Sequence, residues 1–89
     1  MALRIKGQIL TELGDHEKAA ESYKEAIDIL SGLGSQLELG RALYQRGRLL
    51  NMENQRDAAV KDIENARVIF EECGAKNDLR LTLSLTETL

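Results

Sequence analysis

The stretch that decides the fold reads Gly7-Gln8-Ile9-Leu10-Thr11-Glu12-Leu13-Gly14-Asp15-His16-Glu17-Lys18-Ala19-Ala20-Glu21-Ser22-Tyr23-Lys24-Glu25-Ala26. It is divided at Gly14-Asp15, because glycine readily adopts the left-handed conformation that ends a helix and aspartate caps the next one. The stretch therefore predicts two helices joined by a tight bend. Small residues stand where these helices must approach closely, at Gly7, Ala19 and Ala26.

The same pattern returns forty residues further along the chain. The residues at this spacing from Gly7, Leu10, Ala19 and Ala26 are Gly47, Leu50, Ala59 and Ala66. Such an internal repeat is typical of arrays in which one supersecondary unit buries its apolar face against the next. The sequence therefore predicts successive helix hairpins.

The composition indicates a small helical domain. The chain has 89 residues, no proline, 3% aromatic residues and 43% hydrophobic residues, and abundant leucine, alanine, glutamate, lysine and arginine favour helices. The formal net charge of −3 argues against a nucleic-acid-binding domain that depends on basic charge. No apolar run reaches membrane-spanning length. We therefore expect neither nucleic acid nor a membrane as a partner.

Five helices are expected, and residues typical of helix starts and ends mark their boundaries. Ser35 and Glu38 fit a capping box, and Asn54 and Asn77 are candidate caps. Gly74 is expected to end the fourth helix, after an inward-facing set that includes Val60 and Cys73. The expected ranges are 2–13, 15–31, 35–52, 54–74 and 77–89.

The fifth segment gives two conflicting signals. Leucine alternates strictly with other residues from Leu79 to Leu85, which is the period of a strand. The repeat instead puts Leu79 and Leu83 in the places of Leu39 and Leu43, which belong to the third helix. We predict a helix, because a lone strand would have no partner for its backbone hydrogen bonds.

The repeated residues resemble the tetratricopeptide repeat, in a variant with a period of forty residues. The first copy reads Leu3-Arg4-Ile5-Lys6-Gly7-Gln8-Ile9-Leu10, then Ala19-Ala20-Glu21-Ser22-Tyr23, then Ala26. The second reads Leu43-Tyr44-Gln45-Arg46-Gly47-Arg48-Leu49-Leu50, then Ala59-Val60-Lys61-Asp62-Ile63, then Ala66. The glycine and alanine positions follow the family signature. Lysine and arginine replace its leucine, at Lys6 and Arg46, and Ser31 and Glu71 stand in place of its proline.

The resemblance implies an all-α fold of antiparallel helix hairpins stacked in a right-handed superhelical array, an α-solenoid. A HEAT-like hairpin array is the alternative. We expect one domain, with a first repeat at about 1–34, a second at about 35–74 and a half repeat at 75–89.

No catalytic, metal-binding or cofactor-binding motif is present in the sequence. His16 is the only histidine, and no motif places a nucleophile beside it. Cys73 is the only cysteine, so it forms no internal disulfide, and it suits a reducing compartment such as the cytoplasm. We therefore expect a protein that is not an enzyme and needs no cofactor or metal.

In the family that the chain resembles, the first helices of successive repeats line a concave groove that holds a peptide or a partner's helix. The resemblance places these residues of the present chain in that groove: Arg4, Gln8, Thr11, Glu12, Arg41, Tyr44, Arg48 and Met52. Arginine and tyrosine often dominate interface energetics. We therefore expect a protein-protein interaction scaffold that binds a protein or peptide, with an acidic peptide as the natural ligand.

Two other functions stay open: a sensing or regulatory accessory module of a larger enzyme or transcription regulator, and a structural self-associating segment. The second rests on Leu81, Leu85 and Leu89, which are four residues apart on a helix that lacks the polar outer face of a terminal cap. We expect these leucines to be uncovered within this chain. The chain is then a fragment of a larger protein, or it forms a homodimer through its C-terminal helix.

Overall fold

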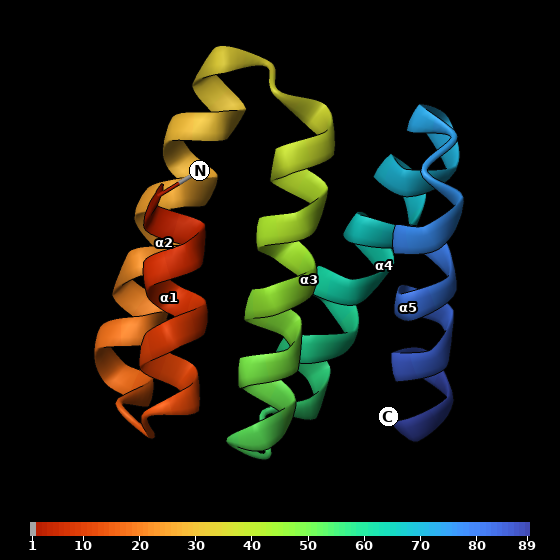
Figure 1. Ribbon diagram of the computed structural model, residues 1–89. Helices are drawn as coiled ribbons and strands as arrows, with labels where there is room; N and C mark the ends of the chain where they lie inside the picture. Colours follow the sequence, from red (N-terminus) through yellow and green to blue (C-terminus); the bar gives the residue numbers. More distant parts are fainter. Residues whose placement is uncertain (1) are drawn as a thin grey trace.

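The computed structural model describes residues 2–89, with side chains described for residues 6–89. It contains five helices, which are α1 (Ala2–Glu12), α2 (His16–Leu33), α3 (Gln36–Met52), α4 (Arg56–Cys73) and α5 (Lys76–Thr88) (Figure 1). No strand occurs in residues 2–89. The prediction of an all-α fold is confirmed, and so is the choice of a helix for the alternating leucine segment.

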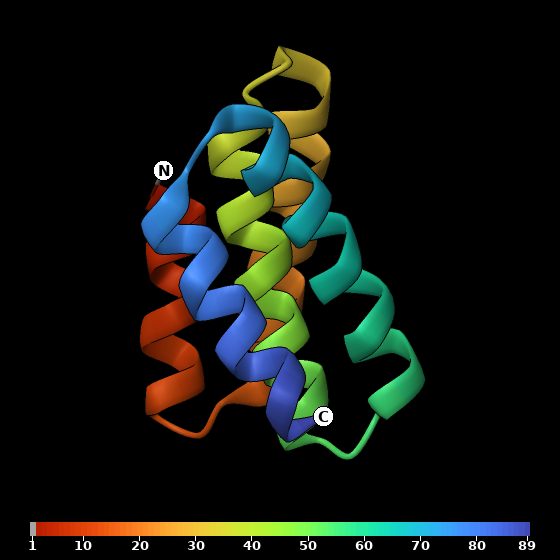
Figure 2. The ribbon, with the colours of Figure 1, turned by 90° about the vertical axis from the view of Figure 1, so that its right-hand side faces the viewer.

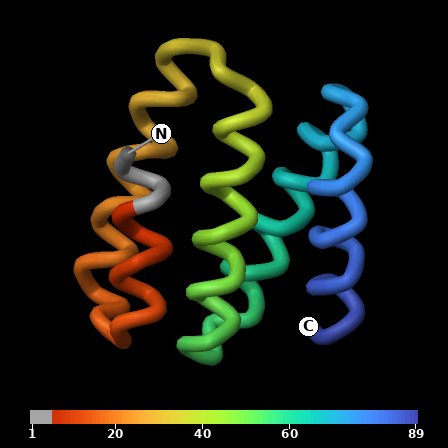
Figure 3. Tube along the Cα trace, viewed as in Figure 1, coloured from red at the N-terminus to blue at the C-terminus, as the bar shows by residue number. Residues whose placement is uncertain are grey.

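The helices form two antiparallel hairpins and a fifth, unpaired helix. Helix α1 packs on α2, and α3 packs on α4. Figure 1 shows α1, α3 and α5 side by side in chain order, with α2 and α4 behind them. Helix α5 lies across α4 and α3, as the turned view in Figure 2 shows. Figure 3 follows the chain through its successive reversals of direction.

The bends confirm the expected boundaries at Gly14, Asp15 and Gly74 and correct those at the end of α2 and the start of α4. Gly14 has a φ of 84°, and the Asp15 carboxylate accepts a hydrogen bond of 3.3 Å from the Lys18 amide, as a helix cap does. Helix α2 continues through Gly32 to Leu33 and ends before Gly34, which has a φ of 70°. Asn54 does not cap α4: its φ is 63°, a left-handed conformation that asparagine tolerates after a helix end.

Ser35 occupies the expected N-cap position of α3, but the expected capping box is absent, and the expected cap at Asn77 is wrong. Ser35 precedes α3, but its side chain makes no capping hydrogen bond. Glu38, its expected partner in the capping box, instead accepts a hydrogen bond of 3.0 Å from Arg41. Asn77 lies inside α5, which begins one residue earlier, after Ala75.

The helices of each hairpin approach closely at glycine, as the repeat predicts. A Cβ atom at Gly7 would lie 2.7 Å from Cε1 of Tyr23, and one at Gly47 would lie 2.5 Å from Cδ1 of Ile63. Both distances are shorter than real carbon contacts. Gly40 of α3 makes a further close approach that the repeat pattern did not predict, because a Cβ atom there would lie 2.8 Å from Cε1 of Phe70.

The core lies between the two layers of helices and joins the hairpins. Leu49 of α3 packs against Ala19 and Tyr23 of α2. Ala42 of α3 packs against Ala26 and Leu30 of α2. A third cluster, between α3 and α4, consists of Leu43, Ala66, Ile69 and Phe70, with Leu79 of α5 at its edge.

Two residues that were expected on the buried face of α4 lie at the surface. Val60 is 39% exposed, and Cys73 is exposed in the last turn of the helix. The buried face of α4 is centred on Ala59, Ile63 and Ala66, so Val60 lies beside this face rather than on it.

Candidate protein-interaction surface

The residues expected in a groove lie on the layer formed by α1, α3 and α5. Arg4 is outside the residues whose side chains are described. Gln8 is half-buried on α1, and Arg48 is exposed on α3. Met52, at the end of α3, is 52% exposed. Tyr44 is half-buried against the core cluster that contains Leu43 and Phe70.

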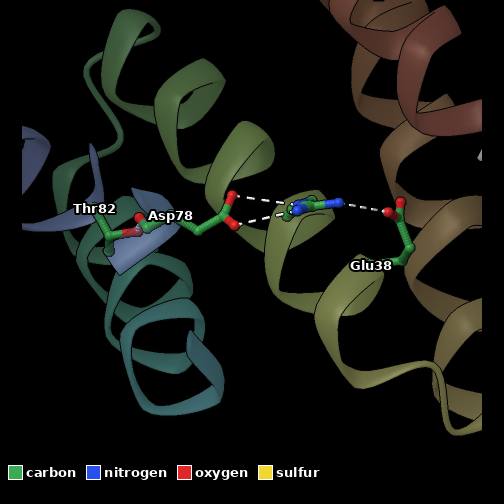
Figure 4. Close-up of polar contacts among 4 residues, drawn as sticks. Glu38, Asp78 and Thr82 are labelled. Atoms are coloured by element: carbon green, nitrogen blue, oxygen red, sulfur yellow. Dashed lines mark hydrogen bonds and ion pairs between the residues drawn. The ribbon is translucent and has the colours of Figure 1, made fainter. Parts of the chain in front are cut away.

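Arg41 is engaged within the chain. Its Nε and Nη2 donate hydrogen bonds of 3.3 and 3.2 Å to the two carboxylate oxygens of Asp78 on α5. Its Nη1 donates to Glu38 at 3.0 Å. Figure 4 shows Asp78 and Glu38 on either side of the guanidinium. The hydrogen bonds to Asp78 raise the pKa of Arg41 above its ordinary value. Through these bonds the guanidinium joins α3 to α5.

Arg48 is the more available cation on this layer. It lies seven residues after Arg41, about two helical turns along α3. Its Nη1 donates one hydrogen bond of 3.1 Å to the side chain of Gln45 on the same helix. A guanidinium has five N–H donors, so most of those on Arg48 can still meet a ligand.

The layer formed by α1, α3 and α5 is less basic than Arg41 and Arg48 alone would suggest. Glu38 and Asp78 bring two negative charges to the one positive charge of Arg41. Arg48 lies outside that cluster. The basic character of α3 on this layer therefore comes from Arg48.

Two equivalent surface hollows, which the sequence did not predict, each lie between the two helices of a hairpin. One has a volume of about 410 Å³ and is lined by Lys6, Leu10, Lys18, Glu21, Ser22 and Glu25. The other has a volume of about 380 Å³ and is lined by Arg46, Leu50, Ala58, Lys61, Asp62 and Asn65. Every lining residue of the second stands forty positions after one of the first. Among the expected groove residues whose side chains the structure describes, none lines either hollow.

An ion pair in the second hollow explains the arginine that departs from the repeat pattern. Arg46 donates hydrogen bonds of 2.6 and 2.9 Å to both carboxylate oxygens of Asp62. The Asp62 side chain is 8% exposed, and this bond raises the pKa of Arg46. The first hollow has Lys6 and Ser22 at these positions. The available signal in the sequence was a positive residue at a position where the repeat pattern has leucine, because a partly buried charge needs a partner.

The C-terminal leucines do not form one uncovered stripe. Leu81 is 55% exposed, but Leu85 and Leu89 are half-buried. Leu83, which was expected to pack on the second repeat, is 45% exposed. The reason is the rotation of α5, whose innermost residue is the fully buried Thr82. The opposite side carries exposed polar residues, Asn77, Arg80, Ser84 and Glu87, so the outer face of α5 is polar after all.

The two reactive side chains singled out in the sequence do not converge. His16 begins α2 and Cys73 ends α4. These helix ends lie at opposite ends of the molecule in Figure 1.

Comparison with protein families agrees with this architecture. Residues 5–29, which cover most of α1 and most of α2, match the family model described as Tetratricopeptide repeat. The chain contains a tetratricopeptide repeat. Helices α3 and α4 form a second hairpin that carries the same small residues at the same positions. No curated protein and no solved structure gives a significant match.

Tetratricopeptide repeats generally bind proteins or peptides, and the repeat found here suggests such a role. Within residues 2–89, every helix is too short or too polar to cross a membrane.

Proposed function

We propose that this tetratricopeptide-repeat chain is a protein-protein interaction scaffold that binds a peptide or a partner helix across α1, α3 and α5. The main support is the arrangement of these first helices side by side, with Arg48 and Met52 exposed on the central one. We place the repeats at about 1–34 and 35–74, followed by a half repeat at 75–89. We also propose that this protein is cytoplasmic and is not an enzyme.

The chemistry of α3 favours a partner that carries a carboxylate. Arg48 offers a planar guanidinium for paired hydrogen bonds to a carboxylate. Tyr44 lies four residues, about one helical turn, before it, and Met52 lies one turn after it. An acidic side chain flanked by apolar residues fits this sequence of contacts. Arg41 contributes mainly by fixing α5, because its donors already meet two carboxylates.

A peptide-binding measurement tests this function. The probes are fluorescent twelve-residue peptides that mix leucine with either glutamate or lysine. We expect the glutamate peptide to bind more tightly and to lose affinity as salt rises. Arg48→Ala should weaken its binding several-fold. The control is Arg67→Ala on α4, where Arg67 pairs with Glu64 and Glu71. Equal binding of both peptides, or equal losses in the two variants, would rule out Arg48 as the acid-binding residue.

Self-association through α5 is a second candidate function, supported by the exposure of Leu81 and Leu83 at the margins of the helix. If a homodimer forms there, Leu81→Ser should shift it toward monomer in sedimentation equilibrium. An unchanged average mass would remove this candidate.

A further inference from the structure

Three positions in the chain share one place in the repeat. Ile9 of α1, Leu49 of α3 and Leu89 after α5 are spaced forty residues apart. Leu49 is fully buried, because it packs against Ala19 and Tyr23 on the second helix of the preceding hairpin. This position therefore docks one hairpin onto the previous one.

At the first of these positions, none of the described residues covers the docking face of α1. Ile9 is 51% exposed, although its counterpart Leu49 is fully buried. Leu13, one turn further along the chain, is 76% exposed. The exposed side of α1 is therefore the side that α3 uses to dock on α2.

The surface that would receive such a face is present on α4. Ala59 and Ile63 stand forty residues after Ala19 and Tyr23 and are almost completely buried. Helix α5 packs on α4, but it buries fully only one residue, Thr82. Leu89, in the docking position, is half-buried. The Arg41–Asp78 ion pair also holds α5, and both side chains are partly exposed.

We propose that the α1–α2 hairpin of a second copy of this chain can replace α5 on α4 and continue the array head to tail. In this arrangement Ile9 of the incoming copy takes the place of Leu89. Helix α5 is then a removable cap that limits assembly. The contact joins two different surfaces, so it leads to open chains of molecules rather than closed dimers.

The repeat itself favours a second copy as the occupant. The incoming α1 has the same register as α5, because Ala2 and Ile9 correspond to Thr82 and Leu89. The incoming α1 has Gly7 at the position that Glu87 occupies in α5, and this glycine is already packed on Tyr23 of its own copy. The incoming helix thus arrives with its own second helix in place. The Arg41–Asp78 ion pair links α3 to the chain's own α5, so it opposes the replacement of α5.

Loosening α5 in the full-length chain tests the proposal by sedimentation velocity and equilibrium. Asp78→Asn weakens the ion pair, and Leu79→Ala weakens the apolar contact with the core cluster. Each variant should associate at several-fold lower concentration than the parent, with an average mass that rises past that of a dimer. Adding Ile9→Glu should return both variants to monomer.

Matched controls separate this contact from general stickiness and from a dimer through Leu81. Val68→Glu changes another exposed apolar residue, 43% exposed on α4, and should leave the association of both loosened variants unchanged. Leu81→Ser should also leave it unchanged. The proposal is overturned if the loosened variants stay monomeric, if Ile9→Glu does not prevent association, or if Val68→Glu prevents it equally.

Discussion

At the scale of single residues, glycine sets the distance between the helices of a hairpin. Gly47→Leu should lower the free energy of unfolding by about 1–3 kcal/mol, because its side chain needs space that Ile63 occupies. Chemical denaturation measures the change. Lys61→Leu, at an exposed site on α4, is the control and should cost little. Equal unfolding midpoints would contradict the close contact of α3 and α4.

The Arg46–Asp62 pair gives a second residue-scale prediction. Asp62→Asn should reduce stability by about 1.5–3 kcal/mol, because a hydrogen-bonded carboxylate is lost beside a charged guanidinium. The control is Glu64→Gln, which breaks a pair whose carboxylate side chain is 48% exposed and should cost less than about 1 kcal/mol. Thermal unfolding compares the two. A larger loss in the control would show that burial does not distinguish these pairs.

At the scale of helices, the two expected caps of α2 and α3 provide a matched comparison. Asp15→Ala removes a capping hydrogen bond and should destabilise the chain by about 0.5–2 kcal/mol. Ser35→Ala should have a much smaller effect, because the Ser35 side chain makes no capping bond. Denaturant midpoints measure both changes. The assignment fails if the serine variant loses as much stability as the aspartate variant.

Helix α5 shows how tertiary contacts select one rotation of a helix about its axis from the several that its sequence allows. Its leucines alternate, so no helical face is uniformly apolar. Contact with α3 and α4 places Leu79 and Thr82 inward and leaves Leu81 and Leu83 at the margins. This rotation keeps the polar residues on the opposite side in water. Hydrophobicity alone predicted a different rotation.

At the scale of the whole molecule, stability should vary along the array. Each hairpin contacts only its neighbours, and α5 packs on one side only. Native-state hydrogen exchange should therefore find the amides of α5 less protected than those of α3 and α4. Arg41→Ala should lower protection in α5 more than in α2, because it removes the link to Asp78. Uniform protection across all five helices would contradict this view.

The sequence by itself determined the all-α architecture and the pairing of helices. Small residues at fixed spacing, at Gly7, Gly47, Ala19 and Ala59, are local signals that need no tertiary information. They specify where helices can approach, and the structure has close contacts at those places. The left-handed bend at Gly14 and the cap at Asp15 were predictable for the same reason.

Only the tertiary structure decided which charges are paired and which leucines are covered. Arg41 and Asp78 are 37 residues apart in the chain, and a periodic pattern contains no information on such a contact. Asp62 is buried because Arg46 approaches it across the hairpin. The rotation of α5, and with it the exposure of Leu81, depends on how its whole surface fits α4. These features depend on the packing of several helices, whereas the hairpins follow from residues within each repeat.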